Sequence, residues 1–452
     1  MPMLHPIAFS LCLSLAALPA FAQSSFFDDI DVSTETESSS LDRAWSHRGF
    51  IQQKFKYGIA APDTNYLFER DRSGLDQVQT DAFLEINADV SDNITLRLSA
   101  KTEFDLVQWS DGELEWQINH EKLFLKDAFS DITFANGHWL RIGHQVFAWG
   151  ESEALSITDV LSPTDQREFG QTELRDIREH VPALLYSLPV AQGKLSFVTT
   201  WDAGENRYAD ASEGFYPYIT LKGSPIEISS RSPETQWEAA LRYEKQFNGG
   251  DISVVLADVN DNNALALPLT SHLIATSSEH APELVRQQKR YQTVGITANR
   301  VWGGFLLRSE LGINVNQSFV NNQQDGIIKE DQLRSALSVQ YSGINDWIFS
   351  YEINTIHTLA SQDSTLLDKT HSFGHVLHLQ NSALNDRITQ HLWLFDLINE
   401  EGSIARWDID YDWSDQWTVA AAAVIYQNDN NESSLYPYRH NDTVNVSIKY
   451  NF

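Results

Sequence analysis

The chain has 452 residues, of which 42% are hydrophobic, 11% aromatic and 21% charged, and its formal net charge at pH 7 is −30. A helical membrane protein is excluded, because each spanning helix needs about 20 consecutive apolar residues. We expect no nucleic-acid partner, because such binding depends on Lys and Arg that neutralise phosphates. The aromatic content argues against disorder. A barrel whose strands alternate apolar and polar residues remains compatible with this composition.

The first 22 residues have the features of a secretory signal peptide. An apolar run from Ile7 to Leu18 is followed by Pro19 and by the A-x-A sequence at 20–22. This pattern predicts cleavage before Gln23. The alternative is a signal anchor that stays attached, but the run is too short to span a bilayer comfortably. We predict a signal peptide over 1–22, an acidic flexible periplasmic lead-in over 23–45 and a barrel over 46–452.

Sulfur chemistry is confined to the predicted signal peptide, which holds the single cysteine, Cys12, and both methionines. The mature chain therefore has no disulfide framework and no thiol nucleophile. No G-x-S-x-G elbow is present, and nothing singles out a catalytic group among the 14 histidines. We expect no enzymatic activity and no cofactor.

The rest of the chain alternates with period 2 in long segments. Over 94–106, Leu96 and Leu98 lie on one face of a strand, and Arg97 and Ser99 lie on the other. One face is apolar enough for lipid, and the other carries charges of both signs, which suits a wet lumen. The pattern predicts an all-β fold, a transmembrane antiparallel up-and-down β-barrel of about 18 strands. The predicted strands cover 47–59, 75–90, 94–106, 117–128, 138–148, 181–189, 194–203, 235–247, 251–259, 289–300, 304–315, 331–342, 346–357, 371–381, 386–397, 402–413, 416–427 and 443–452. Because alternation is weakest over 117–128 and 181–189, 16 strands is the alternative.

Short and long connections alternate along the chain, as in bacterial outer-membrane barrels with short periplasmic turns and long extracellular loops. Aromatic residues cluster beside the short turns and predict a periplasmic aromatic girdle. The alternative is that they are ordinary strand aromatics. The girdle candidates are Trp302, Tyr341, Trp347, Trp413 and Trp417.

The last predicted strand ends on the C-terminal Phe452. Its alternate apolar residues and its terminal aromatic resemble the signal that the outer-membrane barrel assembly machinery reads. The predicted signal comprises Val444, Val446, Ile448, Tyr450 and Phe452. We therefore expect the protein in the outer membrane of a Gram-negative cell, in contact with lipid and lipopolysaccharide.

The connection over 149–180 is the richest polar stretch of the chain. A loop this long with apolar residues inside it is expected to be ordered. Its neighbouring charges predict an ion-pair network, in which Arg167 pairs with Asp165 and Glu168, and Arg175 and Arg178 pair with Asp176 and Glu179. The network either sets a constriction or plug in the lumen or only braces the rim. The lumen candidates are Arg141, Gln145, Glu151, Asp159, Asp165, Arg167, Glu168, Arg175, Asp176, Arg178 and Glu179.

Two other clusters contain residue types that can bind a metal ion. His371, His375 and His378 are close in sequence, but on a strand 378 points away from the other two, so we expect no metal site there. The segment 258–262 (Asp-Val-Asn-Asp-Asn) has the oxygen ligands that calcium prefers, but a solvated acidic loop explains it better.

Part of the chain resembles a known family. The matching runs are Leu140 to Gln145, Trp149-Gly150-Glu151-Ser152, Asp159 to Pro163 and Arg175 to Pro182. They resemble outer-membrane barrels of the domain-of-unknown-function family 1302, which are similar to alginate-export barrels. Family members often have Gly-Arg-Gln before the Trp-Gly-Glu element, and His144 stands at that Arg position here. The resemblance implies RND-type (MmpL-like) exporters and a periplasmic lipoprotein as partners, and the handling of hydrophobic molecules.

Three functions are consistent with these patterns. The first is passage or export of small or hydrophobic molecules, with cations favoured if the lumen is acidic on balance. The second is a non-channel barrel for envelope lipid transport, linked to an RND-type exporter. The third is a surface-loop binding or adhesion protein, which the long loops 204–234 and 260–288 suggest.

Overall fold

The computed structural model describes most of the chain from Trp45 onward. The described residues are 45–59, 74–110, 113–152, 156–172, 176–209, 215, 227–268, 283–320, 326–360, 370–399, 401–428, 430 and 433–452. The predicted signal peptide and nearly all of the predicted lead-in lie outside these residues.

Eighteen strands form one sheet. They are β1 (Trp45–Gly58), β2 (Gly74–Ser91), β3 (Ile94–Ser110), β4 (Glu113–Thr133), β5 (Trp139–Gln145), β7 (Val181–Val190), β8 (Gly193–Thr200), β11 (Glu238–Phe247), β12 (Gly250–Asn260), β15 (Arg290–Trp302), β16 (Phe305–Val320), β17 (Ile327–Ile344), β18 (Trp347–Thr358), β19 (His371–Ala383), β20 (Ile388–Leu397), β21 (Gly402–Asp412), β22 (Trp417–Asn428) and β23 (Thr443–Asn451). The predicted count of 18 is confirmed, and the two weakest predicted strands are present as parts of β4 and β7.

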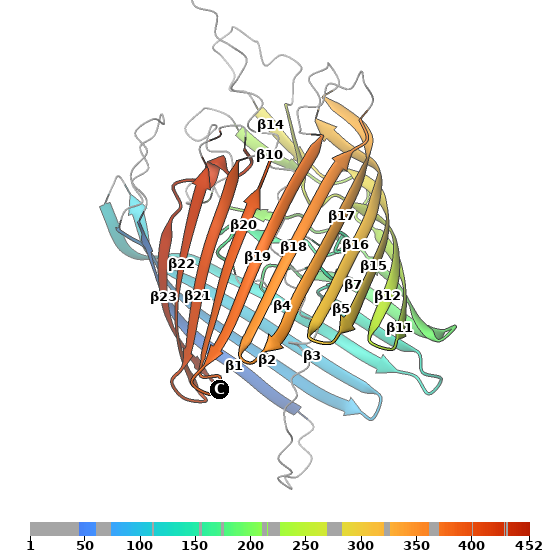
Figure 1. The fold of residues 1–452 in the computed structure, drawn as a ribbon, viewed down its shortest axis with the longest axis horizontal. Helices are drawn as coiled ribbons and strands as arrows, with labels where there is room; N and C mark the ends of the chain where they lie inside the picture. The colour runs from blue at the N-terminus through green and yellow to red at the C-terminus, as the bar shows by residue number, and fades with distance from the viewer. Residues whose placement is uncertain are drawn as a thin grey trace, which may run out of the picture.

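The sheet is closed. Each strand pairs antiparallel with the next barrel strand along the chain, and β23 pairs with β1, with Phe50 opposite Asn451. In Figure 1 the strands β15 to β23 tilt across the front, and β1 to β5 cross behind them with the opposite slope. Closure removes every free edge, which a sheet in lipid requires because the bilayer core offers no hydrogen-bond partners.

The two faces of the wall differ in chemistry. On β16, Leu307 and Leu311 face outward with 38% and 50% of their surface exposed, whereas Arg308 and Glu310 face inward with 7% and 3% exposed. The same alternation gives β23 an outward face that includes Val446. The predicted separation into a lipid face and a polar lumen is confirmed.

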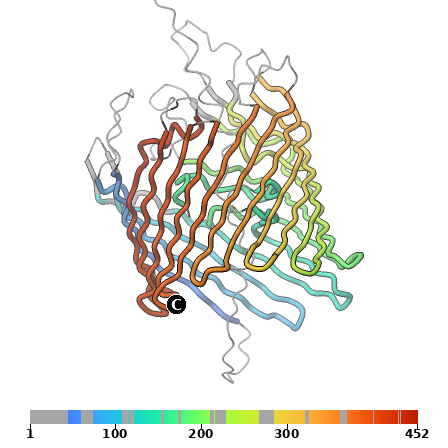
Figure 2. Tube along the Cα trace, viewed as in Figure 1, coloured from blue at the N-terminus to red at the C-terminus, as the bar shows by residue number. Residues whose placement is uncertain are grey.

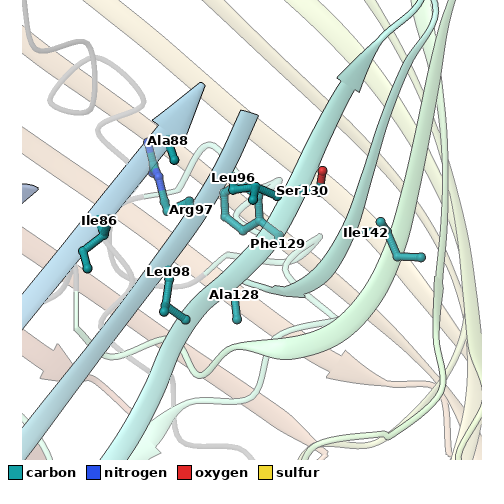
Figure 3. Close-up of a pocket in the computed structure, with 9 residues that line it drawn as sticks. All are labelled: Ile86, Ala88, Leu96, Arg97, Leu98, Ala128, Phe129, Ser130 and Ile142. Atoms are coloured by element: carbon teal, nitrogen blue, oxygen red, sulfur yellow. The ribbon is translucent and has the colours of Figure 1, made fainter. Parts of the chain in front are cut away.

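The outward face also carries a shallow apolar hollow of about 390 Å³ across β2 to β5 (Figure 3). Small side chains, Ala88 and Ala128, leave room between the larger Leu96, Leu98 and Ile142. Leu96, Leu98 and Ile142 are exposed, so the hollow opens toward the membrane side of the wall and is no part of the lumen.

The two ends of the barrel have different connections. Tight turns join β2 to β3, β7 to β8 and β15 to β16, and the C-terminus lies at this end, which we name the turn end (Figure 1). Ala191 and Gln192 adopt φ of 49° and 66°, the left-handed conformation of two-residue hairpin turns. All five girdle candidates lie beside turns at this end, and Trp302 and Trp413 have 75% and 64% of their surface exposed.

Short strands lie outside the barrel sheet. They are β6 (Asp165–Gln166), β9 (Arg207–Tyr208), β10 (Glu227–Arg231), β13 (Leu265–Pro268) and β14 (Glu283–Gln287), and β10 and β14 lie at the opposite end, the loop end (Figure 1). A 3₁₀ turn, η3, covers Tyr436–Tyr438. Among the described residues, no helix is long and apolar enough to span a membrane.

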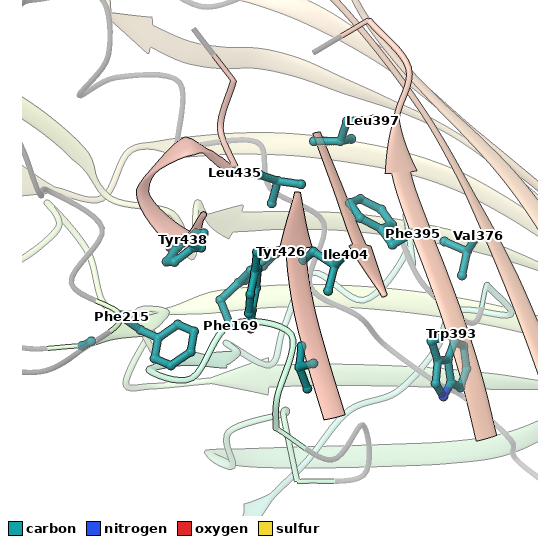
Figure 4. Close-up of a cluster of buried hydrophobic side chains, with 12 residues drawn as sticks. Phe169, Phe215, Val376, Trp393, Phe395, Leu397, Ile404, Tyr426, Leu435 and Tyr438 are labelled. Carbon is teal, nitrogen blue, oxygen red and sulfur yellow. The ribbon is translucent and has the colours of Figure 1, made fainter. Parts of the chain in front are cut away.

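A cluster of buried apolar side chains lies on the inner face of β19 to β22 (Figure 4). Phe395, Ile404 and Tyr426 come from the wall, and Phe169 and Tyr438 come from segments between strands and stack at a ring-centroid distance of 5.1 Å. Burial of large apolar side chains is worth roughly 1.5–3 kcal/mol each. The cluster therefore holds non-strand segments against the inner wall.

Candidate functional site: a strap across the lumen

The described residues between β5 and β7, which are 146–152, 156–172 and 176–180, fold into the barrel, and we call this part of the chain the strap. Gln145 and Val181, at its two ends, are register partners in the β5–β7 ladder. In Figure 2 the green tube of this part of the chain lies within the outline of the barrel. The strap contacts strands on opposite sides of the wall.

Glu310, which faces inward from β16, holds the first half of the strap. Its Oε1 accepts hydrogen bonds from the backbone N–H groups of Glu151 and Ser152, both at 2.6 Å. Its Oε2 accepts the N–H groups of Ile157 at 2.8 Å and Thr158 at 3.2 Å. One buried carboxylate thus satisfies four backbone donors, and hydrogen bonds to charged groups are the stronger kind.

Two wall glycines let this half of the strap approach closely. A Cβ on Gly312 would lie 2.6 Å from Cγ2 of Ile157, and a Cβ on Gly295 would lie 2.6 Å from Cγ2 of Thr158. Both distances are too short for a side chain. The strap therefore packs against the backbone of β15 and β16, with no layer of side chains between.

Asp159 organises the strap internally. Its Oδ1 accepts the backbone N–H groups of Trp149 and Gly150, the latter at 2.7 Å. Its Oδ2 accepts the Nε–H of Arg178 at 3.0 Å and also pairs with an Nη2–H. Asp159 and Arg178 are both buried, so this pair joins the outgoing and returning parts of the strap.

The second half of the strap binds the opposite wall. Lys56 of β1 donates to Glu168 at 2.5 Å, and Asp176 lies 3.5 Å from the ammonium of Lys101 on β3. Arg406 of β21 donates to the carbonyl of Thr172 at 3.0 Å. Further bonds run from the Tyr426 hydroxyl of β22 to the Phe169 carbonyl at 2.5 Å and from Gln171 to Thr443 of β23 at 2.8 Å. The strap is therefore fixed on both sides of the lumen.

The predicted ion-pair network is partly wrong. Arg167 does pair with Asp165, and it also lies 3.4 Å from Glu103 of β3. Glu168 instead pairs with Lys56, Asp176 with Lys101, and Glu179 with Arg207 at 3.5 Å. A carboxylate inside a barrel meets the facing wall as readily as its chain neighbours, so local spacing did not determine these partners. Arg175 lies outside the described residues.

The remaining lumen candidates occupy separate places. Arg141 forms a two-point pair with Asp131 of β4 at 2.8 and 2.9 Å, nearer the turn end. Gln145 is buried where the strap begins and donates to the carbonyl of Ala183 at 3.1 Å. Glu151 accepts from the amide of Asn299 at 3.1 Å, and burial raises the pKa of its carboxyl above the usual value, an effect that this hydrogen bond opposes. Within the described residues Glu151 has no ion-pair partner.

Sequence reasoning missed Glu310, Lys56 and Lys101. Each is a charged residue on the inward face of a strand, and the period-2 alternation predicts that these side chains face the lumen. Nothing in the sequence says that the strap reaches β1, β3 and β16. Lys56 is 112 residues away from its strap partner Glu168 in the sequence, and Glu310 is 159 residues away from Glu151.

The histidine cluster separates on the wall. His371 lies against His357, with Nδ1 atoms 2.7 Å apart, and His375 contacts Asp396 at 3.0 Å. His378 stacks on Trp393 with ring centroids 3.5 Å apart. In the part of the chain that the structure describes, no group of three or more His, Cys, Asp or Glu side chains is placed to hold a metal ion.

The oxygen-rich segment 258–262 also divides. Asp258 pairs with Arg290 at 2.9 Å, and Asn260 donates to the carbonyl of Thr235 at 3.0 Å. Asp261 accepts from Asn263 and Gln317, and Asn262 turns toward the strap carbonyl of Val160. The side chains that could have shared a cation are thus bonded to different partners.

No family model and no curated protein matches the sequence. Several solved structures are similar in fold. Acinetobacter baumannii OccAB1 is 7% identical, with a TM-score of 0.51 over 93% of this chain and 98% of that one. OccAB2 of the same organism is 10% identical, with a TM-score of 0.50 over 90% and 98%. The outer membrane protein opdK from Pseudomonas aeruginosa is 8% identical, with a TM-score of 0.46 over 90% and 98%. This chain has the fold of an outer-membrane β-barrel. At these identities the similarity concerns the fold, and the resemblance to family 1302 stays a prediction.

Proposed function

We propose that the protein is an outer-membrane barrel through which small molecules pass, and that the strap forms its constriction. The observation that carries the proposal is the placement of the strap, which is anchored to β16 on one side and to β1, β3 and β21 to β23 on the other. Barrels of 16–18 strands are wide enough to leave an aqueous channel. A fixed crossing segment would narrow such a channel.

The lumen on the turn-end side of the strap supports a water-filled path. Inward-facing Gln340, His391 and Asp408 are partly exposed there, whereas Glu310 and Glu352, which bind the strap, are buried. Polar side chains that keep contact with water inside a closed wall are typical of a wet interior.

The charge pattern argues against strong ion selectivity. Strap carboxylates Glu168 and Asp176 pair with wall lysines, and Asp159 pairs with Arg178. These three strap carboxylates are therefore neutralised by their partners and add little to a cation preference. Glu151, which has no ion-pair partner among the described residues, contributes to the modest cation preference that we expect.

Conductance across a planar bilayer tests the proposal, with purified full-length protein added to one side. We expect discrete, ohmic channels and a reversal potential that indicates weak selectivity. A sealed barrel, together with altered surface lipid in a deletion strain, would instead favour the lipid-transport function. Loss of adhesion on shortening the loop-end connections, with conductance absent throughout, would favour a surface-binding protein.

We further propose that the mature chain begins at Gln23, that it is no enzyme, and that the barrel assembly machinery recognises β23. The resemblance to family 1302 supports a partnership with an RND-type exporter and a periplasmic lipoprotein. Co-purification of cross-linked complexes from native envelopes tests that partnership.

A further inference from the structure

Two phenylalanine rings lie on the inner wall near the turn end, where an apolar side chain has no lipid to face. Phe50 of β1 and Phe83 of β2 are register partners, and their rings stack with centroids 5.5 Å apart at 23°. Both lie on the inward face, in step with the buried Gln52 and Glu85, and both are partly exposed. Concave sites that bind solutes combine apolar and aromatic surfaces with a few polar groups.

A lysine borders this pair on one side. Lys449 of β23 faces inward, and its Nζ lies 5.8 Å from the centroid of the Phe50 ring. It has no carboxylate partner among the residues that the structure describes, in contrast to Lys54 and Lys101, which pair with Asp81 at 2.7 and 3.6 Å. A positive charge at the rim of the ring pair is therefore available to a ligand.

Arg97 lies farther along the wall, because its register partner on β2 is Asn87, whereas the register partner of Phe83 on β3 is Lys101. Arg97 of β3 faces inward, and its Nε–H donates to the neutral amide oxygen of Asn87 at 2.8 Å. Its guanidinium lies 5.6 Å from the centroid of the Phe129 ring. Lys101 is held by carboxylates, among them Asp81 and Glu103, so Lys449 is the cation that remains beside the ring pair.

We propose that this patch, made of Lys449, Phe50 and Phe83, is a binding subsite for an anion attached to a flat apolar ring, such as an aromatic carboxylate. The ring packs on the Phe50–Phe83 pair, where stacked or edge-on aromatic contacts are favourable, and the carboxylate lies beside Lys449. The subsite deepens the proposed function, because it places a recognition surface in the lumen between the turn-end opening and the strap.

Equilibrium binding to the full-length protein in detergent micelles tests the subsite without requiring transport. The probes are benzoate and cyclohexanecarboxylate, which share a charge and a similar size but differ in having a flat ring. We expect saturable benzoate binding that weakens as salt rises, with cyclohexanecarboxylate several-fold weaker. Equal binding of the two probes, or no saturable binding of benzoate, would overturn the proposal.

Variants locate the binding. Phe83→Leu keeps an apolar side chain but removes the ring, and we expect it to weaken benzoate binding about 2- to 10-fold, the range that an aromatic contact supports. Lys449→Met should weaken it and flatten the salt dependence. Phe55→Ala is the matched control, because Phe55 lies on the same strand but faces outward with 45% of its surface exposed, and benzoate binding should not change. An equal loss in Phe55→Ala and Phe83→Leu would refute the assigned location.

Conductance separates this proposal from the proposed function. If the protein binds benzoate but forms no channels, the proposed subsite stands and the proposed function of small-molecule passage is wrong. If the protein forms open channels but does not bind benzoate, the proposed function stands and the proposed subsite is wrong.

Discussion

At the scale of single residues, Glu310 is the most consequential side chain inside the barrel. It is almost fully buried, and its two carboxylate oxygens accept four backbone N–H groups of the strap. An amide at this position would keep one acceptor and direct its own N–H₂ group at the remaining donors. A lone carboxylate is therefore required in this geometry.

We expect Glu310→Gln to weaken docking of the strap by about 2–4 kcal/mol, since hydrogen bonds to a charged group contribute about 1.5–3 kcal/mol each. The readout is single-channel recording, in which the variant should show larger or noisier conductance. Asp258→Asn is the control, because Asp258 pairs with Arg290 and does not touch the strap. Unchanged conductance and unchanged gating in Glu310→Gln would show that the strap is held by other contacts.

Glu151 gives the lumen a pH dependence. Burial raises its pKa, so its charge is lost at a higher pH than that of an ordinary glutamate. As the pH falls, the strap loses a negative charge, and the reversal potential should shift toward anions. Because the protonated form is favoured in the folded protein, this group adds stability as the pH falls and removes it as the pH rises. Glu151→Gln should abolish the shift, and a shift that persists in this variant would assign it to another group.

At the scale of elements, each barrel strand has one face in lipid and one in the lumen. Leu337 of β17 faces outward with 55% of its surface exposed, in the middle of the strand, whereas Trp302 lies beside a tight turn. A cation in the middle of the membrane costs about 2–4 kcal/mol, and near the interface about 0–1 kcal/mol. We expect Leu337→Arg to lower the free energy of unfolding from lipid vesicles by that larger amount and Trp302→Arg by much less. Equal losses would mean that Leu337 is not at membrane depth.

The closing strand is the second element with a specific expectation. Phe452 and Gly49 exchange two backbone hydrogen bonds of 2.9 Å, which complete the ladder between β23 and β1. A Cβ on Gly49 would lie 2.7 Å from the Phe452 ring, so the ring covers that glycine. Deleting Phe452 should reduce the amount of heat-modifiable, folded protein in the outer membrane. Asn451→Ala is the control, because it keeps the backbone of β23, and it should assemble normally. Normal assembly of the variant that lacks Phe452 would show that Phe452 is not part of the assembly signal.

At the scale of the whole molecule, barrel and strap are separable. The β5–β7 ladder is complete without the strap, because Gln145 and Val181 already face each other in register. Replacing 146–180 by a two-residue Asn-Gly turn should therefore leave a closed, heat-modifiable barrel and raise its conductance several-fold, since the turn suits an antiparallel pair. A folded variant with unchanged conductance would show that the constriction lies elsewhere.

The sequence by itself determined the barrel. Period-2 alternation fixes which side chains face lipid, and the spacing of tight turns fixes the strand count, because register in a half-apolar strand cannot slip by one residue without exposing the wrong face. Strands that looked weak, such as 181–189, are strands in the structure because the ladder on both sides supplies their hydrogen bonds. The polar stretch 149–180 lies between β5 and β7, as the predicted strands 138–148 and 181–189 imply.

Only the tertiary structure decided what that stretch touches. Arg167 and Asp165 pair as their spacing suggests, but Glu168, Asp176 and Glu179 reach Lys56, Lys101 and Arg207 instead. The ring pair Phe50–Phe83 and Lys449 beside it likewise come from β1, β2 and β23, which closure alone brings together. Alternation is a local property that a sequence records, whereas a partner across a lumen depends on how the whole wall closes.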